Sequence, residues 1–120
     1  MNIDALHHLE TLREILLEYP ATEEYTCFGT PAFRVKKKLI CRLREDGETL
    51  AVHCDDRVPW MKKNPKVFFI TDHYFNYRFV LVRLSAVSEK DLKRVLHDAW
   101  MQVAPKRVIK EFEESVSNKE

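Results

Sequence analysis

The beginning of the chain is patterned for one amphipathic helix. Apolar side chains recur at steps of three and four residues and therefore line one helix face: Ala5, Leu9, Leu12, Leu16 and Tyr19. Asn2 is a suitable N-cap, and Pro20 is a suitable stop signal. We therefore expect a first helix between these two residues.

From Glu24 the apolar spacing changes to two residues, which is the period of a half-buried strand. In the strand expected from Arg34 to Arg44, Leu39, Cys41 and Leu43 point one way, and Lys38, Arg42 and Arg44 point the other. The segment 45–48 contains Asp-Gly, which suits a tight reversal. Residues 49–53 should therefore return as an antiparallel strand.

The second half of the chain alternates short elements and then ends in a longer helix. Asp55 or Asp56 can cap a short helix that Asn64-Pro65 ends, and residues 67–70 resume extended structure. An aromatic loop at 72–78 precedes the run 79–84, which is apolar on both faces and suits a strand inside the sheet. Ser88 to Asp91 has the capping-box spacing, and the helix that it opens should end at Pro105.

This order predicts an α+β fold, a two-layer sandwich of an antiparallel sheet with N- and C-terminal helices. A chain of 120 residues with 45% hydrophobic residues suits one domain. We place that domain at residues 1–112 and expect a polar tail at 113–120 that frays after Phe112.

Composition limits the partners and the compartment. The 20 Lys and Arg residues nearly balance the 19 Asp and Glu residues, so net charge alone indicates no anionic partner. Three widely separated cysteines do not describe a disulfide framework, and no stretch suits a signal peptide or a membrane span. We expect a cytoplasmic monomer with no membrane association.

The segment Cys27-Phe28-Gly29-Thr30-Pro31-Ala32-Phe33-Arg34-Val35 resembles the FG-x-PAF-R/K-V signature of the MmcQ/YjbR family of small bacterial proteins. Trp60, the run 80–84 and the segment 103–107 follow in the family's order, so the resemblance spans about residues 17–107. It implies a frataxin-like (CyaY-like) α+β fold and DNA binding. Lys37 stands where many members have glycine, and Asn76 lies in a loop that often contains one.

The candidate DNA contacts come from a basic segment and from an aromatic loop. Six bases and no acid lie between positions 34 and 44, and alternate positions should project from one sheet face as a row that follows phosphates. The loop offers stacking and hydrogen bonding to bases. Two further cations follow the last helix, where binding phosphate competes with stabilising the helix end. The predicted site is Arg34, Lys36, Lys37, Lys38, Arg42, Arg44, Tyr74, Asn76, Tyr77, Arg78, Lys106 and Arg107.

Plainer interpretations exist for the same residues. Lysines on an exposed strand also prevent edge-to-edge aggregation, and loop aromatics often fold inward over a small core. We assign the remaining large apolar side chains of these segments to the core: Phe28, Pro31, Phe33, Trp60 and Trp100.

The alternatives to DNA binding are a metal site, a protein-binding module and an enzyme. The first-helix acids Glu10, Glu14 and Glu18, near Asp4 and His7, could hold a hard cation, although acids on such a helix are usually its wet face. The acidic first helix or the aromatic loop could instead engage a protein partner. No nucleophile or phosphate-loop motif is present, so we expect no enzyme activity, no metal and no cofactor.

Overall fold

The first helix forms where its apolar spacing places it. The computed structural model describes residues 2–117, and in it α1 spans Ile3–Leu16. Asn2 caps the helix, because its side-chain oxygen accepts a hydrogen bond from the backbone N–H of Ala5 at 2.7 Å. The four buried residues of α1 are those expected from the pattern: Ala5, Leu9, Leu12 and Leu16.

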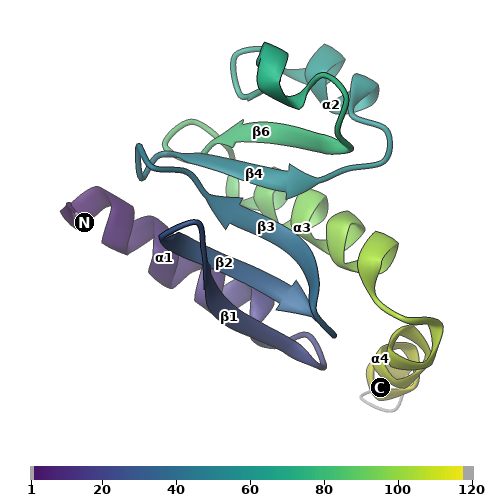
Figure 1. Ribbon diagram of the computed structural model, residues 1–120. Helices are drawn as coiled ribbons and strands as arrows, with labels where there is room; N and C mark the ends of the chain where they lie inside the picture. Colours follow the sequence, from purple (N-terminus) through teal and green to yellow (C-terminus); the bar gives the residue numbers. More distant parts are fainter. Residues whose placement is uncertain (1, 118–120) are drawn as a thin grey trace.

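Six strands form a single antiparallel sheet in the order β1-β2-β3-β4-β6-β5 (Figure 1). Their bounds are Thr22–Cys27 for β1, Thr30–Val35 for β2, Lys38–Leu43 for β3, Thr49–His53 for β4, Phe68–Phe69 for β5 and Phe79–Arg83 for β6. The doubly apolar run at 79–83 lies between β4 and β5, so the expected interior position of β6 is confirmed.

The helices lie on one face of this sheet (Figure 1). Helix α3 spans Glu89–Val103, and the hydroxyl of Ser88 accepts a hydrogen bond from the N–H of Asp91, as the capping-box spacing predicts. The core between helices and sheet centres on Trp100, whose indole N–H donates to the hydroxyl of Thr22 at 2.9 Å. The α+β two-layer arrangement is thereby confirmed, and no long helix of residues 2–117 crosses the opposite sheet face.

Two short elements lie on opposite sides of the sheet. Helix α2 spans Val58–Lys63 on the helix side, where Trp60 and Met61 pack against the main core. A 3-10 turn, η1, spans Asp72–Tyr74 within the aromatic loop and borders the open face. Tyr74 packs with Ala51 and Leu81 in a small second apolar cluster on the open face. The loop therefore folds over only one part of the sheet.

The basic segment is a hairpin and not the single strand that we expected. Strand β2 ends at Val35, and Lys36 and Lys37 have φ angles of 48° and 72°, which reverse the chain before β3 begins at Lys38. Two consecutive positive φ angles are the geometry of a type I′ turn. Alternation across the whole segment 34–44 is therefore broken at the turn.

A register shift in β3 changes the expected faces further. Phe33 pairs with Cys41 and Arg34 pairs with Leu39, so Ile40 is an extra residue in β3. Opposed residues of an antiparallel pair project from the same face. Leu39 therefore lies on the open face, contrary to expectation, while Ile40 joins Cys41 in the core.

The same pairing rule places Lys38 on the helix side of the sheet, because it stands opposite the buried Val35. Only Arg34, Arg42 and Arg44 of the expected row share the open face. The prediction that all five alternating cations form one row on one sheet face is therefore wrong.

The C-terminal segment is a further helix. Helix α4 spans Lys106–Ser117, where we expected fraying after Phe112, and residues 118–120 of the expected tail lie outside the described part of the chain. Val108 is buried in the main core, and Phe112 packs on Tyr19 and Trp100. An apolar stripe at helical spacing thus holds α4 in the helix layer.

Within residues 2–117, no helix has the length and apolar character needed to cross a membrane.

The turn after β3 gives a test of the fold. Gly47 has a φ of +67°, and a Cβ built there would lie 2.7 Å from the Cβ of Ala5 in α1. We expect Gly47→Ala to lower the free energy of unfolding by about 2–4 kcal/mol, since left-handed strain adds to overpacking. Gly29→Ala is the matched control, because Gly29 has a φ of +80° but no atom within 4 Å of the added Cβ. Its loss should be only about 1 kcal/mol in urea unfolding, and equal losses would contradict the docking of α1 on this turn.

Candidate nucleic-acid interface on the open sheet face

The open face of the sheet is hollowed into a groove of about 660 Å³. Its lining comes from four strands, from the β1–β2 turn and from the aromatic loop: Cys27, Phe28, Leu39, Arg42, Arg44, Glu45, Ala51, His73, Tyr74, Tyr77 and Phe79. We call this the open-face groove. Aromatic rings and guanidinium groups from segments far apart in the sequence meet here.

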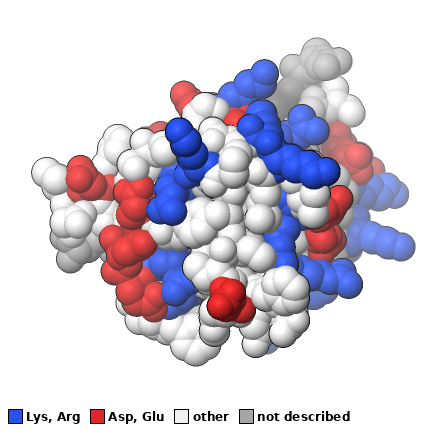
Figure 2. Space-filling model, turned by 90° about the horizontal axis from the view of Figure 1, so that it is seen from above, with Lys and Arg blue, Asp and Glu red and all other residues white. Residues whose placement is uncertain are grey.

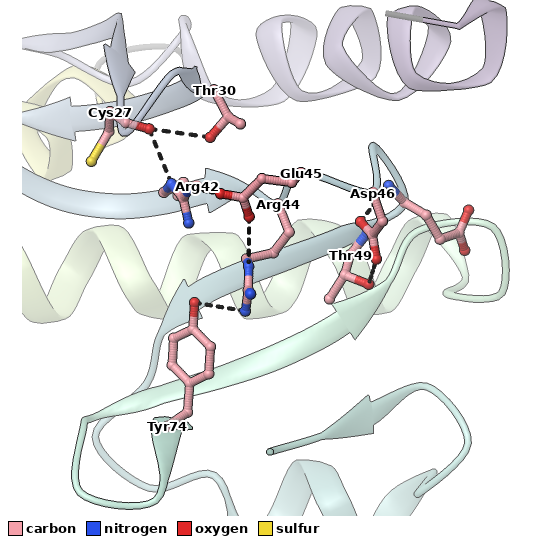
Figure 3. Close-up of polar contacts among 9 residues, drawn as sticks. Cys27, Thr30, Arg42, Arg44, Glu45, Asp46, Thr49 and Tyr74 are labelled. Carbon is pink, nitrogen blue, oxygen red and sulfur yellow. Dashed lines mark hydrogen bonds and ion pairs between the residues drawn. The ribbon is translucent and has the colours of Figure 1, made fainter. Parts of the chain in front are cut away.

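Two arginines form the polar floor of the groove and share one carboxylate (Figure 3). Arg42 donates from Nε to the carbonyl oxygen of Cys27 at 3.0 Å and from Nη2 to Glu45. Arg44 lies 3.3 Å from the other oxygen of Glu45 and donates to the hydroxyl of Tyr74 at 2.9 Å. Arg42 is 9% exposed, so it acts first as a structural cation.

The charge of Glu45 is held in place by its surroundings. Its backbone N–H and then the guanidinium of Arg42 lower the pKa of this carboxyl below its usual value. Glu45 therefore stays ionised at neutral pH and offsets part of the charge of both arginines. The groove floor is a hydrogen-bonded array in which one carboxylate offsets one of two guanidinium charges.

Arg34 is also paired, on the same sheet face. Its Nε lies 2.6 Å from a carboxylate oxygen of Glu23, and its guanidinium carbon lies 4.2 Å from the ring centroid of Tyr25. All three open-face arginines of the predicted row thus have an acidic neighbour.

The free cations of the basic segment are the lysines. Lys36, Lys37 and Lys38 are exposed, and no carboxylate among the described residues lies within 4.0 Å of them. They occupy the tip of the β2–β3 hairpin, next to the end of β3 from which Leu39 enters the groove. We call them the lysine tip.

The aromatic residues divide into a wall and a rim. Tyr74, predicted to reach bases, is 8% exposed and serves as a wall that packs on Ala51 and Leu81. Tyr77 is 57% exposed at the groove. Phe28, which we assigned to the core, is 88% exposed with its ring 5.4 Å from the guanidinium of Arg42, so that assignment is wrong.

Phe28 could have been found from its place next to Gly29. A two-residue turn between two strands puts both residues at positive φ and directs a side chain outward. The other core assignments fare better: Phe33 and Trp100 are buried and Trp60 packs against Phe68, while Pro31 is half-buried.

Arg57 is a residue of the candidate site that no motif or spacing in the sequence indicates. Its guanidinium donates four hydrogen bonds to backbone carbonyls of the aromatic loop and of β6: Tyr74 at 3.2 Å, Phe75 at 2.9 Å, Tyr77 at 2.7 Å and Phe79 at 3.1 Å. Five donors in a planar fork suit this task. Arg57 is therefore the positioning residue for the loop that borders the groove.

The remaining predicted residues lie away from the groove. Asn76 and Arg78 are exposed on the outer side of the loop, and Arg78 lies 3.6 Å from Asp55. Lys106 and Arg107 begin α4 in the helix layer, and so do not simply trail a helix end as expected. The structure does not bring these four residues to the open-face groove.

Charge is dispersed over the face of the molecule that Figure 2 shows. Figure 2 shows Lys and Arg side chains in separate groups around a largely uncharged centre, with acidic side chains beside them. A polyanion therefore finds local contacts on that face and no continuous basic band.

The alternative chemistries find no assembled site in residues 2–117. No group of three His, Cys, Asp or Glu side chains there could hold a metal ion, so Glu10, Glu14 and Glu18 do not converge with Asp4 and His7. Burial raises the pKa of the Cys41 thiol and raises that of Cys54 to about 11. Both side chains are therefore neutral thiols at physiological pH.

Comparisons with known proteins agree with the resemblance drawn from residues 27–35. The profile of the YjbR family matches residues 17–102, well over half of the chain, and the chain belongs to this family. It is also 32% identical over 71 residues to an uncharacterized protein of Mycobacterium bovis and, equally, to one of Mycobacterium tuberculosis. These matches cover 59% of this chain and 49% of each relative, so the matched segment spans about half the length of these relatives. No solved structure matches the chain.

The carbonyl contacts of Arg57 predict how the loop responds to substitution. In Arg57→Ala, the amides of Tyr74, Phe75 and Tyr77, which donate hydrogen bonds within the loop, should exchange with solvent faster than in wild type. The free energy of unfolding should fall by about 2 kcal/mol, since hydrogen bonds from a charged donor are lost.

Arg78→Ala is the matched control, because the Arg78 side chain is 77% exposed and lies 3.6 Å from the carboxylate of Asp55. Exchange should be unchanged in that variant. Arg57→Lys should resemble Arg57→Ala, because one ammonium group cannot span four carbonyls. Unchanged exchange in both Arg57 variants would remove the positioning role.

Proposed function

We propose that this domain is a non-catalytic DNA-binding member of the YjbR family. The lysine tip attracts phosphates, and the open-face groove with its aromatic rim receives the bases. DNA is the partner that the sequence suggested, but the contact residues differ from the predicted set. The residues that we propose to contact DNA are Lys36, Lys37, Lys38, Phe28 and Tyr77.

One observation carries the proposal above the others. Three lysines without a carboxylate partner among the described residues stand at the tip of the β2–β3 hairpin, with Lys38 on the helix side of the sheet. The next residue, Leu39, lines a groove with exposed aromatic rings. Proteins that bind nucleic acid without a recognition helix combine cations for the backbone with aromatic platforms for bases. The residues present have the chemistry for both tasks.

The electrostatics indicate weak, salt-sensitive binding. The arginines already have acidic partners, so about three phosphate contacts remain, each giving a salt slope of roughly −0.9 on duplex DNA and roughly −0.7 on a single strand. Affinity should be micromolar or weaker, and measurement at ~50 mM salt gives the largest signal.

Removing the lysine tip tests the phosphate contacts. Positions 36 and 37 have positive φ, where asparagine and glycine are favoured, so Lys36→Asn, Lys37→Gly and Lys38→Gln together remove three charges without straining the turn. We expect at least a tenfold loss of affinity for labelled DNA in fluorescence anisotropy, similar for all sequences, and a flatter dependence on salt.

The control removes the same charge from another surface. The control variant combines three substitutions on α4, in the helix layer: Lys106→Gln, Arg107→Gln and Lys110→Gln. This variant should bind nearly as well as wild type. Equal losses in the two triple variants would mean that net charge alone drives binding, and a larger loss on α4 would place the contact there.

The shared carboxylate of the groove floor gives an independent test. Glu45→Gln removes the partner of Arg42 and Arg44, so both guanidinium groups gain free positive charge next to the bound strand. Affinity for DNA should rise several-fold, while Glu111→Gln, which makes the same change of charge on exposed α4, should have little effect. Titration of both variants against one labelled oligonucleotide measures the difference, and unchanged affinity in Glu45→Gln would exclude the groove floor from the interface.

A further inference from the structure

We infer that the open-face groove takes unpaired bases, so that the domain prefers single-stranded DNA to duplex. The inference rests on the proposed DNA-binding function and specifies the form of the substrate. It assigns Phe28 and Tyr77 as the stacking residues and Arg42 and Arg44 as the polar floor beneath the base.

Phe28 is held in a backbone conformation that its side chain disfavours. Its φ is 51°, and Gly29 follows with a φ of 80°, so the pair fills a two-residue turn that normally selects asparagine or glycine at the first position. Left-handed φ at a bulky residue is a strained feature that concentrates at binding sites. A contribution to fold stability does not explain why a phenylalanine stands at this position, because its side chain is 88% exposed.

The surroundings of Phe28 leave one ring face available. Arg42 lies under the ring at 5.4 Å, and the groove beside it continues to Tyr77. Arg42 itself is fixed by the carbonyl of Cys27 and by Glu45, so the guanidinium supports the ring without moving. A flat base can stack on such a prepared ring at little cost in side-chain entropy.

The groove floor suits the edge of a base. Guanidinium donors, the carboxylate of Glu45 and the hydroxyl of Tyr74 provide donors and acceptors within one hollow of about 660 Å³. An unpaired base presents hydrogen-bonding groups of both kinds. Since the arginines already interact with Glu45, they can bind a neutral base edge without acting as phosphate contacts.

A duplex suits this surface poorly. Its bases are stacked and hide the faces that Phe28 and Tyr77 would contact, and its affinity depends on many phosphate contacts. Among the described residues near the groove, the exposed cations without acidic partners are those of the lysine tip, because Arg57 is engaged by backbone carbonyls. The aromatic rim therefore adds binding energy for a single strand and almost none for a duplex.

The experiment compares one labelled single strand of roughly 20 nucleotides, long enough to cover such a site, with its duplex at ~50 mM salt by fluorescence anisotropy. Wild type should bind the single strand about tenfold more tightly. Phe28→Ala and Tyr77→Ala should each weaken single-strand binding about tenfold and leave duplex binding unchanged.

Phe75→Ala is the matched control, because Phe75 is 67% exposed in the same loop but does not line the groove. It should bind both forms as wild type does. Free adenosine monophosphate should compete only at millimolar concentration, since one nucleotide lacks the contacts of a strand.

Three results would overturn the inference: equal affinity for both forms, equal effects of Phe28→Ala and Phe75→Ala, or full competition by micromolar mononucleotide. In the first two cases the proposed DNA binding still stands through the lysine tip. Absence of binding to either form would instead remove the proposed function itself.

Discussion

The structure depends on a sheet that is covered by long helices on one face only. Helices α1, α3 and α4 bury one face around Trp100. Within the described part of the chain, the side chains of the other face have no helix layer to pack against and need partners on that face. They find these partners in a small apolar cluster around Tyr74 and in arginines that pair with acids and aromatic rings. The open-face groove is the hollow that remains between the apolar cluster and the paired arginines.

The groove is shaped by elements that contribute little to the main core. Arg57 fixes the loop on one side through four backbone carbonyls, and the β1–β2 turn fixes Phe28 on the other. The hydrogen bonds of Arg57 and the β1–β2 turn both fix backbone positions, so the side chains that border the groove are free to contact a ligand. Pre-ordered borders lower the entropy that a bound strand must lose.

Electrostatics separates two roles among the basic residues. Arginines stand on the open face, where single hydrogen bonds to Glu23 and Glu45 and a stacked contact with Tyr25 hold them. Lysines stand at the hairpin tip, where the flexible stem keeps each ammonium group in water. A near-neutral protein can in this way keep a few mobile cations beside a groove whose arginines are partly neutralised.

The sequence by itself determined α1, β4, β6 and α3, the helix caps at Asn2 and Ser88, the two-layer class and the family, because these depend on local spacing and on short motifs. It did not determine the β2–β3 turn or α4. Only the tertiary structure decided which side chains share the open face. The left-handed turn at Lys36-Lys37 and the extra residue Ile40 each shift the alternation of β3 relative to β2. Since side chains alternate with a period of two, one added residue moves its neighbours to the other face, and no count along the chain reveals this before the strands pair.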